Sequence, residues 1–88
     1  MRIEFLEKFY TDLDKIKVKS IKESTHKIIL KVEMANSLSD VPNVKKLSGH
    51  KLAYRIRLGD YRIGIFVEGN LVEFARIVHR KDIYKVFP

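Results

Sequence analysis

Arginines recur at alternate positions on both sides of a Gly-Asp pair in the middle of the chain. Arg55 and Arg57 precede this pair, which occupies residues 59–60, and Arg62 follows it. If the segment forms a β-hairpin, alternate residues share one face of the sheet, and these three arginines lie together. Like charges that face each other across a sheet are destabilising. Cations held together at such a cost indicate a binding site for an anion.

The runs that flank the Gly-Asp pair have the two-residue period of β-strands. Apolar side chains alternate with charged or small ones along 52–58 and again along 61–68. Two such runs joined by Gly-Asp predict a hairpin with a two-residue loop, in which Leu58 pairs with Tyr61. By parity, Arg57 then lies opposite Arg62, with Arg55 on the same face.

Four short motifs in this half of the chain resemble the signature of the RelE/ParE superfamily, the toxins of toxin–antitoxin systems. They are Lys46-Leu47-Ser48-Gly49, Tyr54–Arg57, Gly59–Arg62 and His79–Tyr84, in the order and at the spacing of the family. The resemblance is specific from Lys45 to Tyr84 and only general before it. It implies an α+β fold in which a short N-terminal strand and a helical hairpin pack on one face of an antiparallel β-meander.

The resemblance also implies a chemistry, because some members of the family cut messenger RNA in the ribosomal A site. There the RNA 2′-hydroxyl attacks its own phosphate, which requires a base, cations for the pentavalent dianion and a proton donor for the leaving oxygen. By resemblance, Arg62 stabilises the phosphate, Arg80 protonates or stabilises the leaving group, and Tyr84 stacks on or near the reacting base. No step requires a metal ion or a cofactor, and the sequence shows no metal-binding spacing.

Each of these residues also has a structural interpretation. Arg62 could form an ion pair with Glu68 or Glu73, and Arg80 could be an ordinary cation beyond a strand end. Tyr84 could pack with Phe87 to anchor the tail. The sequence leaves these interpretations open.

The residue that takes the proton from the 2′-hydroxyl is a separate question. Arg55 and Arg57 occupy positions where an RNA-cleaving branch of the family has lysines, and a guanidinium, with a pKa above ~12, is not a base at neutral pH. His79 is the first candidate because imidazole titrates near neutrality, with Lys51 and His50 as alternatives. The cations expected to bind RNA are Arg55, Arg57, Lys51 and Lys46.

Composition indicates the kind of partner. The chain has 88 residues, a net charge of +7 and no cysteine, which is the size of a single domain, residues 1–88, with no disulfide or thiolate metal site. So basic a chain favours a polyanion, although a lysine-rich surface kept for solubility is the alternative. No apolar run is long enough to cross a membrane, and we expect a cytoplasmic protein.

The resemblance implies two kinds of partner: a cognate antitoxin with an acidic, partly disordered segment, and the ribosome with its mRNA. Two rival functions remain. One is that of the ParE-like branch, which poisons DNA gyrase and is not a nuclease. The other is a non-catalytic module that binds RNA or protein. The charge of the chain suits all of these and does not separate them.

The remaining elements must hold the hairpin in place. Alternation predicts a first strand at Arg2–Phe5, and apolar spacings of three and four predict a helix along 6–16. A second helix is expected to begin near Ile21 with Ser20 as its N-cap, because Ser20 and Glu23 form a capping-box pattern. Its outer face of lysines is expected to be solvated.

The end of the chain is less determined. A third strand is expected at Leu71–Val78, in one of two registers: Val67 pairs with Val72, or the strand is shifted by one residue. The tail, His79–Pro88, is expected to turn away from the sheet. That would leave the face opposite the helices open and basic.

Overall fold

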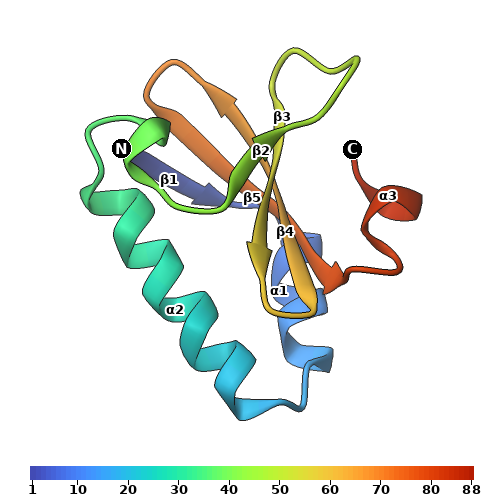
Figure 1. Cartoon of the computed structure of the whole chain (residues 1–88). Helices are drawn as coiled ribbons and strands as arrows, with labels where there is room; N and C mark the ends of the chain where they lie inside the picture. The colour runs from blue at the N-terminus through green and yellow to red at the C-terminus, as the bar shows by residue number, and fades with distance from the viewer.

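The computed structural model describes all 88 residues, which form two long helices, a five-stranded sheet and a short C-terminal helix (Figure 1). No helix is both long and apolar enough to cross a membrane. In chain order the elements are β1 (Arg2–Phe5), α1 (Glu7–Lys15), α2 (Lys19–Met34), a 3₁₀ turn (Leu38–Asp40), β2 (Val44–Lys46), β3 (Ala53–Leu58), β4 (Tyr61–Glu68), β5 (Leu71–His79) and α3 (Ile83–Val86).

The sheet has the strand order β1-β5-β4-β3-β2. Strands β2 to β5 form the expected antiparallel meander, and β1 adds a parallel strand beside β5. The predicted α+β class is therefore confirmed, with a mixed sheet. Parallel pairing of β1 is possible because the rest of the chain, including both long helices, connects β1 to β5.

The central hairpin has the predicted register. Leu58 pairs with Tyr61, and Arg57 lies directly opposite Arg62. The turn requires a residue with positive φ at position 59, where Gly59 has a φ of 59°. The alternation of the sequence therefore brings the arginines to one face.

A β-bulge settles the register of β5. Val67 pairs with Val72, as the two-residue loop at 69–70 predicts, but the register shifts between Gly64 and Ile65 of β4. Ile65 pairs with Phe74 and Ile63 with Ile77, so β5 uses three residue steps where β4 uses two. The bulge buries Phe74 and Ile77 on the same face, which neither uninterrupted register allows.

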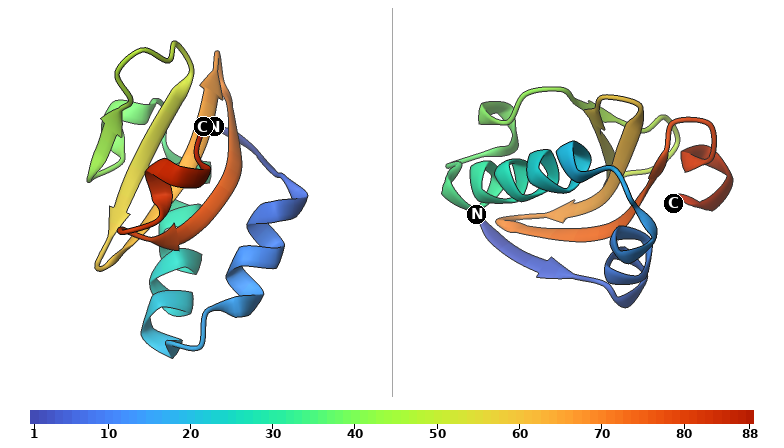
Figure 2. Two further views of the ribbon diagram at one scale, coloured as in Figure 1. Left: turned by 90° about the vertical axis from the view of Figure 1, so that its right-hand side faces the viewer. Right: turned by 90° about the horizontal axis from the view of Figure 1, so that it is seen from below.

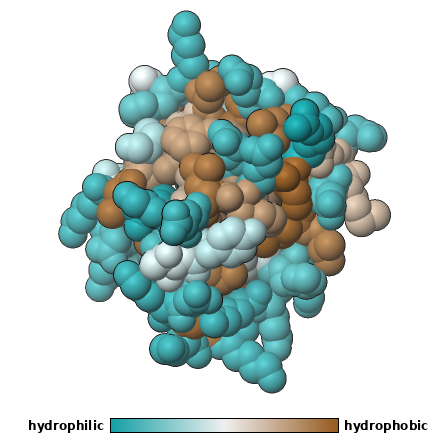
Figure 3. Space-filling view, turned by 180° about the vertical axis from the view of Figure 1, so that it is seen from behind, coloured by the Kyte–Doolittle hydropathy of each residue, from teal (hydrophilic) through white to brown (hydrophobic).

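The main core lies between the sheet and the two long helices. Helix α2 crosses one face of the curved sheet, and α1 packs along β5 (Figure 2). Buried residues of both helices join those of the strands in one cluster: Phe9, Ile16, Ile28, Val32, Val41, Ile56, Ile63, Ile65, Val72, Phe74 and Ile77. Burial of these apolar side chains fixes the helices against the sheet. The surface seen from behind has apolar side chains near its middle, surrounded by hydrophilic ones (Figure 3).

The predicted cap of α2 is wrong. The helix begins at Lys19, with Val18 at the N-cap position and no side-chain cap, so Ser20 lies inside the first turn. Helix α1 ends where Ile16, only 5% exposed, leaves the helix in an extended conformation and enters the core. Tertiary packing at Ile16 therefore determines the break, and the capping-box pattern that begins four residues later does not.

The expectation that the tail turns away is also wrong. Helix α3 folds back onto the face opposite α2 (Figure 2), where Ile83 and Phe87 are buried in a second apolar cluster. The other members of this cluster are Leu47, Ala53 and Ala75. The tail carries two apolar side chains, Ile83 and Phe87, which pack against small side chains of the sheet such as Ala53 and Ala75. This face is therefore partly covered, and only its remaining part is open.

Candidate functional site

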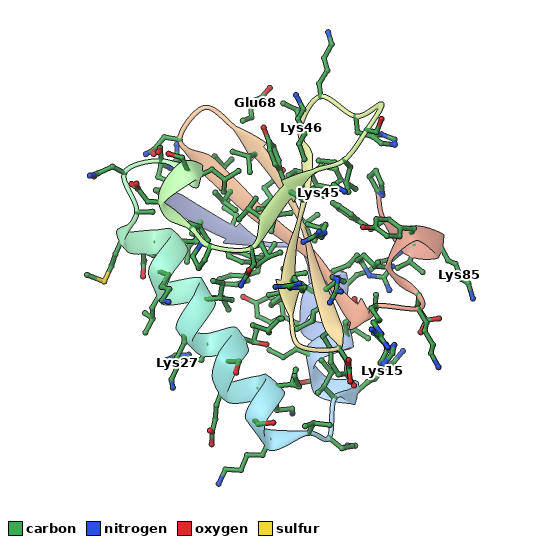
Figure 4. All side chains as sticks on the ribbon, in the orientation of Figure 1. Lys15, Lys27, Lys45, Lys46, Glu68 and Lys85 are labelled. Carbon is green, nitrogen blue, oxygen red and sulfur yellow. The ribbon has the colours of Figure 1, made fainter.

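The open part of this face carries four cations from three adjacent strands. Arg57 pairs with Arg62, and Lys45 of β2 pairs with Arg55, which in turn pairs with Gly64. By parity these side chains share the face opposite α2. Lys45 was not predicted from the sequence, whereas Lys46, which was, has the opposite parity in the strand; both residues come from β2 (Figure 4). The alternation of β3 could have identified Lys45 only if the pairing of β2 had been known.

Arg62 is held in place by its own hairpin. Its Nη1 donates hydrogen bonds to the carbonyl oxygens of Gly59 and Tyr61, both at 2.8 Å. It forms no ion pair, so neither Glu68 nor Glu73 neutralises it. The structural interpretation of Arg62 as half of a salt bridge is therefore excluded. A guanidinium fixed by carbonyls keeps donors available for an anion.

The electrostatic surroundings of Arg62 are unfavourable to its own charge. Partial burial lowers its pKa below the ordinary value for arginine, and the positive charges of Arg55, Arg57 and Arg80 lower it further. Only Tyr84 acts in the opposite direction. These effects mean that a negative ligand would relieve repulsion already present in the folded protein.

Arg55 has an unused donor in the same region. Its Nη1 donates to the carbonyl oxygen of Asn43 at 3.1 Å, but its Nε is buried and has no hydrogen-bond partner. A buried donor without a partner costs about 1–3 kcal/mol.

Arg80 and Tyr84 reach this site from the end of β5 and from α3. The Nε of Arg80 lies 3.9 Å from Oδ1 of Asp60, and both side chains are exposed, so the ion pair is weak. Tyr84 is 64% exposed. Phe87 anchors the tail instead, with its ring 5.0 Å from that of Phe66. Tyr84 is therefore not needed for packing and remains free to stack.

His79 is the predicted site residue that the structure does not bring to the arginines. It pairs with Tyr61, on the face that carries Ile63, and its ring meets the Tyr61 ring edge-on at 5.6 Å. Its Nδ1 accepts a hydrogen bond from the backbone N–H of Lys81 at 3.2 Å. His79 therefore lies on the α1 side of the sheet, because the period of two sends it to the face opposite Arg62.

A groove beside Tyr84 contains a different histidine. It has a volume of about 420 Å³, and it lies between the loop after β2 and the tail. Lys46 and His50 line it on one side, and Tyr84 and Phe87 on the other. Lys51 borders the adjoining hollow of the same loop. The groove thus joins the predicted cations of the loop to Tyr84. No group of three or more His, Asp or Glu side chains in the structure could hold a metal ion.

A mixed five-stranded sheet with two helices on one side and an arginine-rich face on the other defines a class of small toxins, those of RelE type. Residues 3–84 match the family described as "ParE toxin of type II toxin-antitoxin system, parDE", and the chain belongs to this family within the RelE/ParE superfamily.

Individual relatives agree with this assignment. The chain is 40% identical to Toxin RelE3 of Methanocaldococcus jannaschii over 89 residues, covering all of both chains. It superposes on the toxin of a RelB-RelE antitoxin-toxin complex from Methanococcus jannaschii with a TM-score of 0.82 and 40% identity, covering 97% of this chain and 99% of that one.

A more distant structure, an archaeal RelE-RelB complex from Pyrococcus horikoshii OT3, superposes with a TM-score of 0.73 and covers 93% of this chain and 97% of that one. At 21% identity it supports the fold alone. The predicted superfamily and fold are thus confirmed, and the chain is a toxin–antitoxin toxin of RelE type.

Proposed function

We propose that this toxin cleaves messenger RNA on the ribosome. The observation that carries the proposal is the cluster around Arg62, in which arginines lie close together with no carboxylate that neutralises Arg62. Such a cluster suits a phosphodiester, whose charge increases as the reaction reaches its transition state. The 2′-oxygen forms a bond to phosphorus while the bond to the 5′-oxygen breaks, which leaves a 2′,3′-cyclic phosphate and a 5′-hydroxyl.

The geometry suggests a role for each side chain. Arg62, fixed by two carbonyls, stabilises the pentavalent phosphate, and Arg55 adds its positive charge. Arg80, exposed at the end of β5, protonates or stabilises the leaving 5′-oxygen. Tyr84 stacks on a base from its exposed position on α3. Arg57, Lys45, Lys46 and Lys51 attract the RNA backbone.

His50 is the better candidate for the base that takes the 2′-hydroxyl proton. Imidazole is the side chain whose titration range suits this step. Of the three histidines, His50 lines the groove with Tyr84, whereas His79 lies on the α1 side and His26 is exposed on α2. We therefore move the role of general base from His79 to His50.

The same proposal includes the partners. Crystal structures of two relatives are complexes of RelE with RelB antitoxin, and we infer that this chain also binds a cognate antitoxin. An acidic, partly disordered segment would complement its charge of +7. The ribosome and mRNA would compete for the same arginines, and the protein would act in the cytoplasm.

A second function is supported by the matching family, which is described as the ParE toxin family. In that case the toxin would poison DNA gyrase, and the arginines would contact protein or DNA without chemistry. Induced expression of the toxin, followed by mapping of the 5′ ends of messages, separates the two. Cuts within translated codons support cleavage of mRNA. Intact messages with gyrase-linked DNA breaks would replace it with the ParE-like function, and neither effect would favour a non-catalytic binding module.

A further inference from the structure

Gly64 leaves a space in the middle of β4 that another part of the chain fills. A Cβ at this position would lie 2.6–2.8 Å from three atoms of the Phe87 ring, closer than real Cβ contacts. The φ of Gly64 is not in the positive range that only glycine adopts freely. This residue is therefore glycine because of the close approach of Phe87, not because of its backbone conformation.

Phe87 is the outer anchor of the C-terminal tail. Its ring is 3% exposed and lies 5.0 Å from the ring of Phe66. Its backbone N–H donates to the carbonyl oxygen of Ile83 at 2.8 Å, and Ile83 is fully buried. Helix α3 has only four residues, too few to be stable on its own. The position of the helix therefore depends on these two buried side chains.

The side chains between the anchors point outward. Tyr84 is 64% exposed and Val86 is 39% exposed, and Lys85 extends away from the sheet (Figure 4). Tyr84 lines the groove together with Lys45 and His50, and the tail that carries it lies over Gly64, which pairs with Arg55 and is two residues from Arg62 on the same strand. The residue that the tail presents to the site is thus separate from the residues that hold the tail.

We propose that Phe87 is a positioning residue: by filling the space over Gly64 it holds α3 so that Tyr84 stays beside Arg62 and one wall of the groove remains in place. This inference rests on the proposed cleavage of RNA for its effect on rate. Its structural part, that the position of Tyr84 relative to Arg62 depends on Phe87, does not rest on that function. Misplacement of a reacting group by about 1 Å can cost roughly a hundredfold in rate.

Two substitutions, one at each residue, test the packing of the Phe87 ring over Gly64. Phe87→Ala removes the ring, and Gly64→Ala fills its space with a methyl group. Each should slow single-turnover cleavage of ribosome-bound mRNA by about tenfold to a hundredfold, while binding changes by less than about threefold, because the arginines are untouched. Gly64→Ala should add nothing in a Phe87→Ala background, since the ring is then absent. Val86→Ala is the matched control in the tail and should behave as the wild type.

Two measurements follow the tail itself. Release of the ring should shift the methyl resonances of Ile83 in NMR spectra and expose the bond after Lys85 to trypsin. The Nε–H resonance of Arg62 should move in Phe87→Ala and in Tyr84→Ala by a similar amount. A released tail with an unchanged Arg62 resonance overturns the proposal, and so does a released tail with a normal cleavage rate.

The same measurements separate this inference from the function on which it rests. If the wild-type protein does not cleave RNA, the proposed function fails. The Arg62 resonance then decides alone whether Phe87 positions Tyr84: a shift in Phe87→Ala supports the inference, and no shift overturns it.

Discussion

Arg76 and Arg62 are both strand arginines of one sheet, and their surroundings are opposite. Arg76 donates from Nε and Nη2 to the two carboxylate oxygens of Asp12, at 2.7 and 3.0 Å, and Asp12 is 6% exposed. These hydrogen bonds raise the pKa of Arg76 above the ordinary value for arginine. Arg62 has no carboxylate partner, and burial together with neighbouring arginines lowers its pKa.

The difference shows which arginine serves the fold and which is available to a ligand. Asp12 also accepts the backbone N–H of Ile77 at 3.1 Å, so the pair ties α1 to β5. The charges of the Asp12–Arg76 pair neutralise each other within the protein. The positive charges around Arg62 have no such partner in the protein, as expected of a site that binds a polyanion.

The largest effect expected from this comparison is on stability. Arg76→Ala leaves the buried carboxylate of Asp12 without its partner and should lower the free energy of unfolding by about 3 kcal/mol. Urea unfolding measures the change. Arg57→Ala is the matched control, since Arg57 is an exposed strand arginine, and should change stability by less than about 0.5 kcal/mol. Similar values for the two variants would remove the distinction between the two kinds of strand arginine.

The next effect compares histidines on the two faces. His50→Gln should lower the rate of mRNA cleavage by about a hundredfold, the scale of a lost general base. It should also flatten the dependence of the rate on pH, because a glutamine amide cannot act as a base. His79→Gln should keep both the rate and the pH profile. If His79→Gln lost the rate and His50→Gln kept it, His79 would be the base, and its position on the α1 side of the sheet would not matter for catalysis.

A smaller effect concerns salt. The folded protein lowers the pKa of Arg62, which means that it disfavours the charged form of the guanidinium. At any pH at which Arg62 is charged, the arginine cluster therefore lowers the stability of the protein. Screening by an increase from about 0.05 to 0.5 M NaCl should stabilise the wild type by less than about 1 kcal/mol. The gain should shrink in the double variant Arg55→Ala, Arg57→Ala. The charge-matched control, Lys22→Ala with Lys27→Ala on α2, should keep it, and equal losses would mean that only net charge matters.

The smallest effect is expected on the helix side. Ser20 lies within the first turn of α2 and forms no cap, so Ser20→Ala should change the free energy of unfolding by less than about 0.5 kcal/mol. A genuine Ser cap would cost about 0.5–2 kcal/mol. Thermal or urea unfolding distinguishes these values. A loss of more than 1 kcal/mol would show that capping, not the burial of Ile16, determines where α2 begins.

The hairpin could be predicted from the sequence because its information is local. Alternation and the Gly-Asp pair determine the register, so the opposition of Arg57 and Arg62 follows from the residues themselves. The first strand and the apolar faces of the helices were predictable for the same reason. Family motifs added the superfamily, which the comparisons confirm.

Other features depend on contacts between distant residues. The bulge opposite Gly64 depends on which residues of β5 must be buried, and the docking of the tail depends on the space that Gly64 leaves for Phe87. Neither follows from a repeating pattern. His79 was misplaced relative to the arginines because its position in the motif does not reveal its face, whereas its pairing with Tyr61 does. The ion pair of Arg76 with Asp12, 64 residues apart, gave no sequence signal.

Binding, cleavage and stability measured together in Arg62→Ala decide whether Arg62 acts on the phosphate. We expect a cleavage rate lower by roughly a hundredfold or more, the scale of one lost oxyanion donor. We also expect ribosome binding to weaken far less and the free energy of unfolding not to fall. Arg62→Lys should recover only part of the rate, because an ammonium cannot form the bidentate contact. Equal losses of binding and cleavage would mean that Arg62 only tethers RNA, and a fully active, toxic Arg62→Ala protein would contradict the nuclease mechanism.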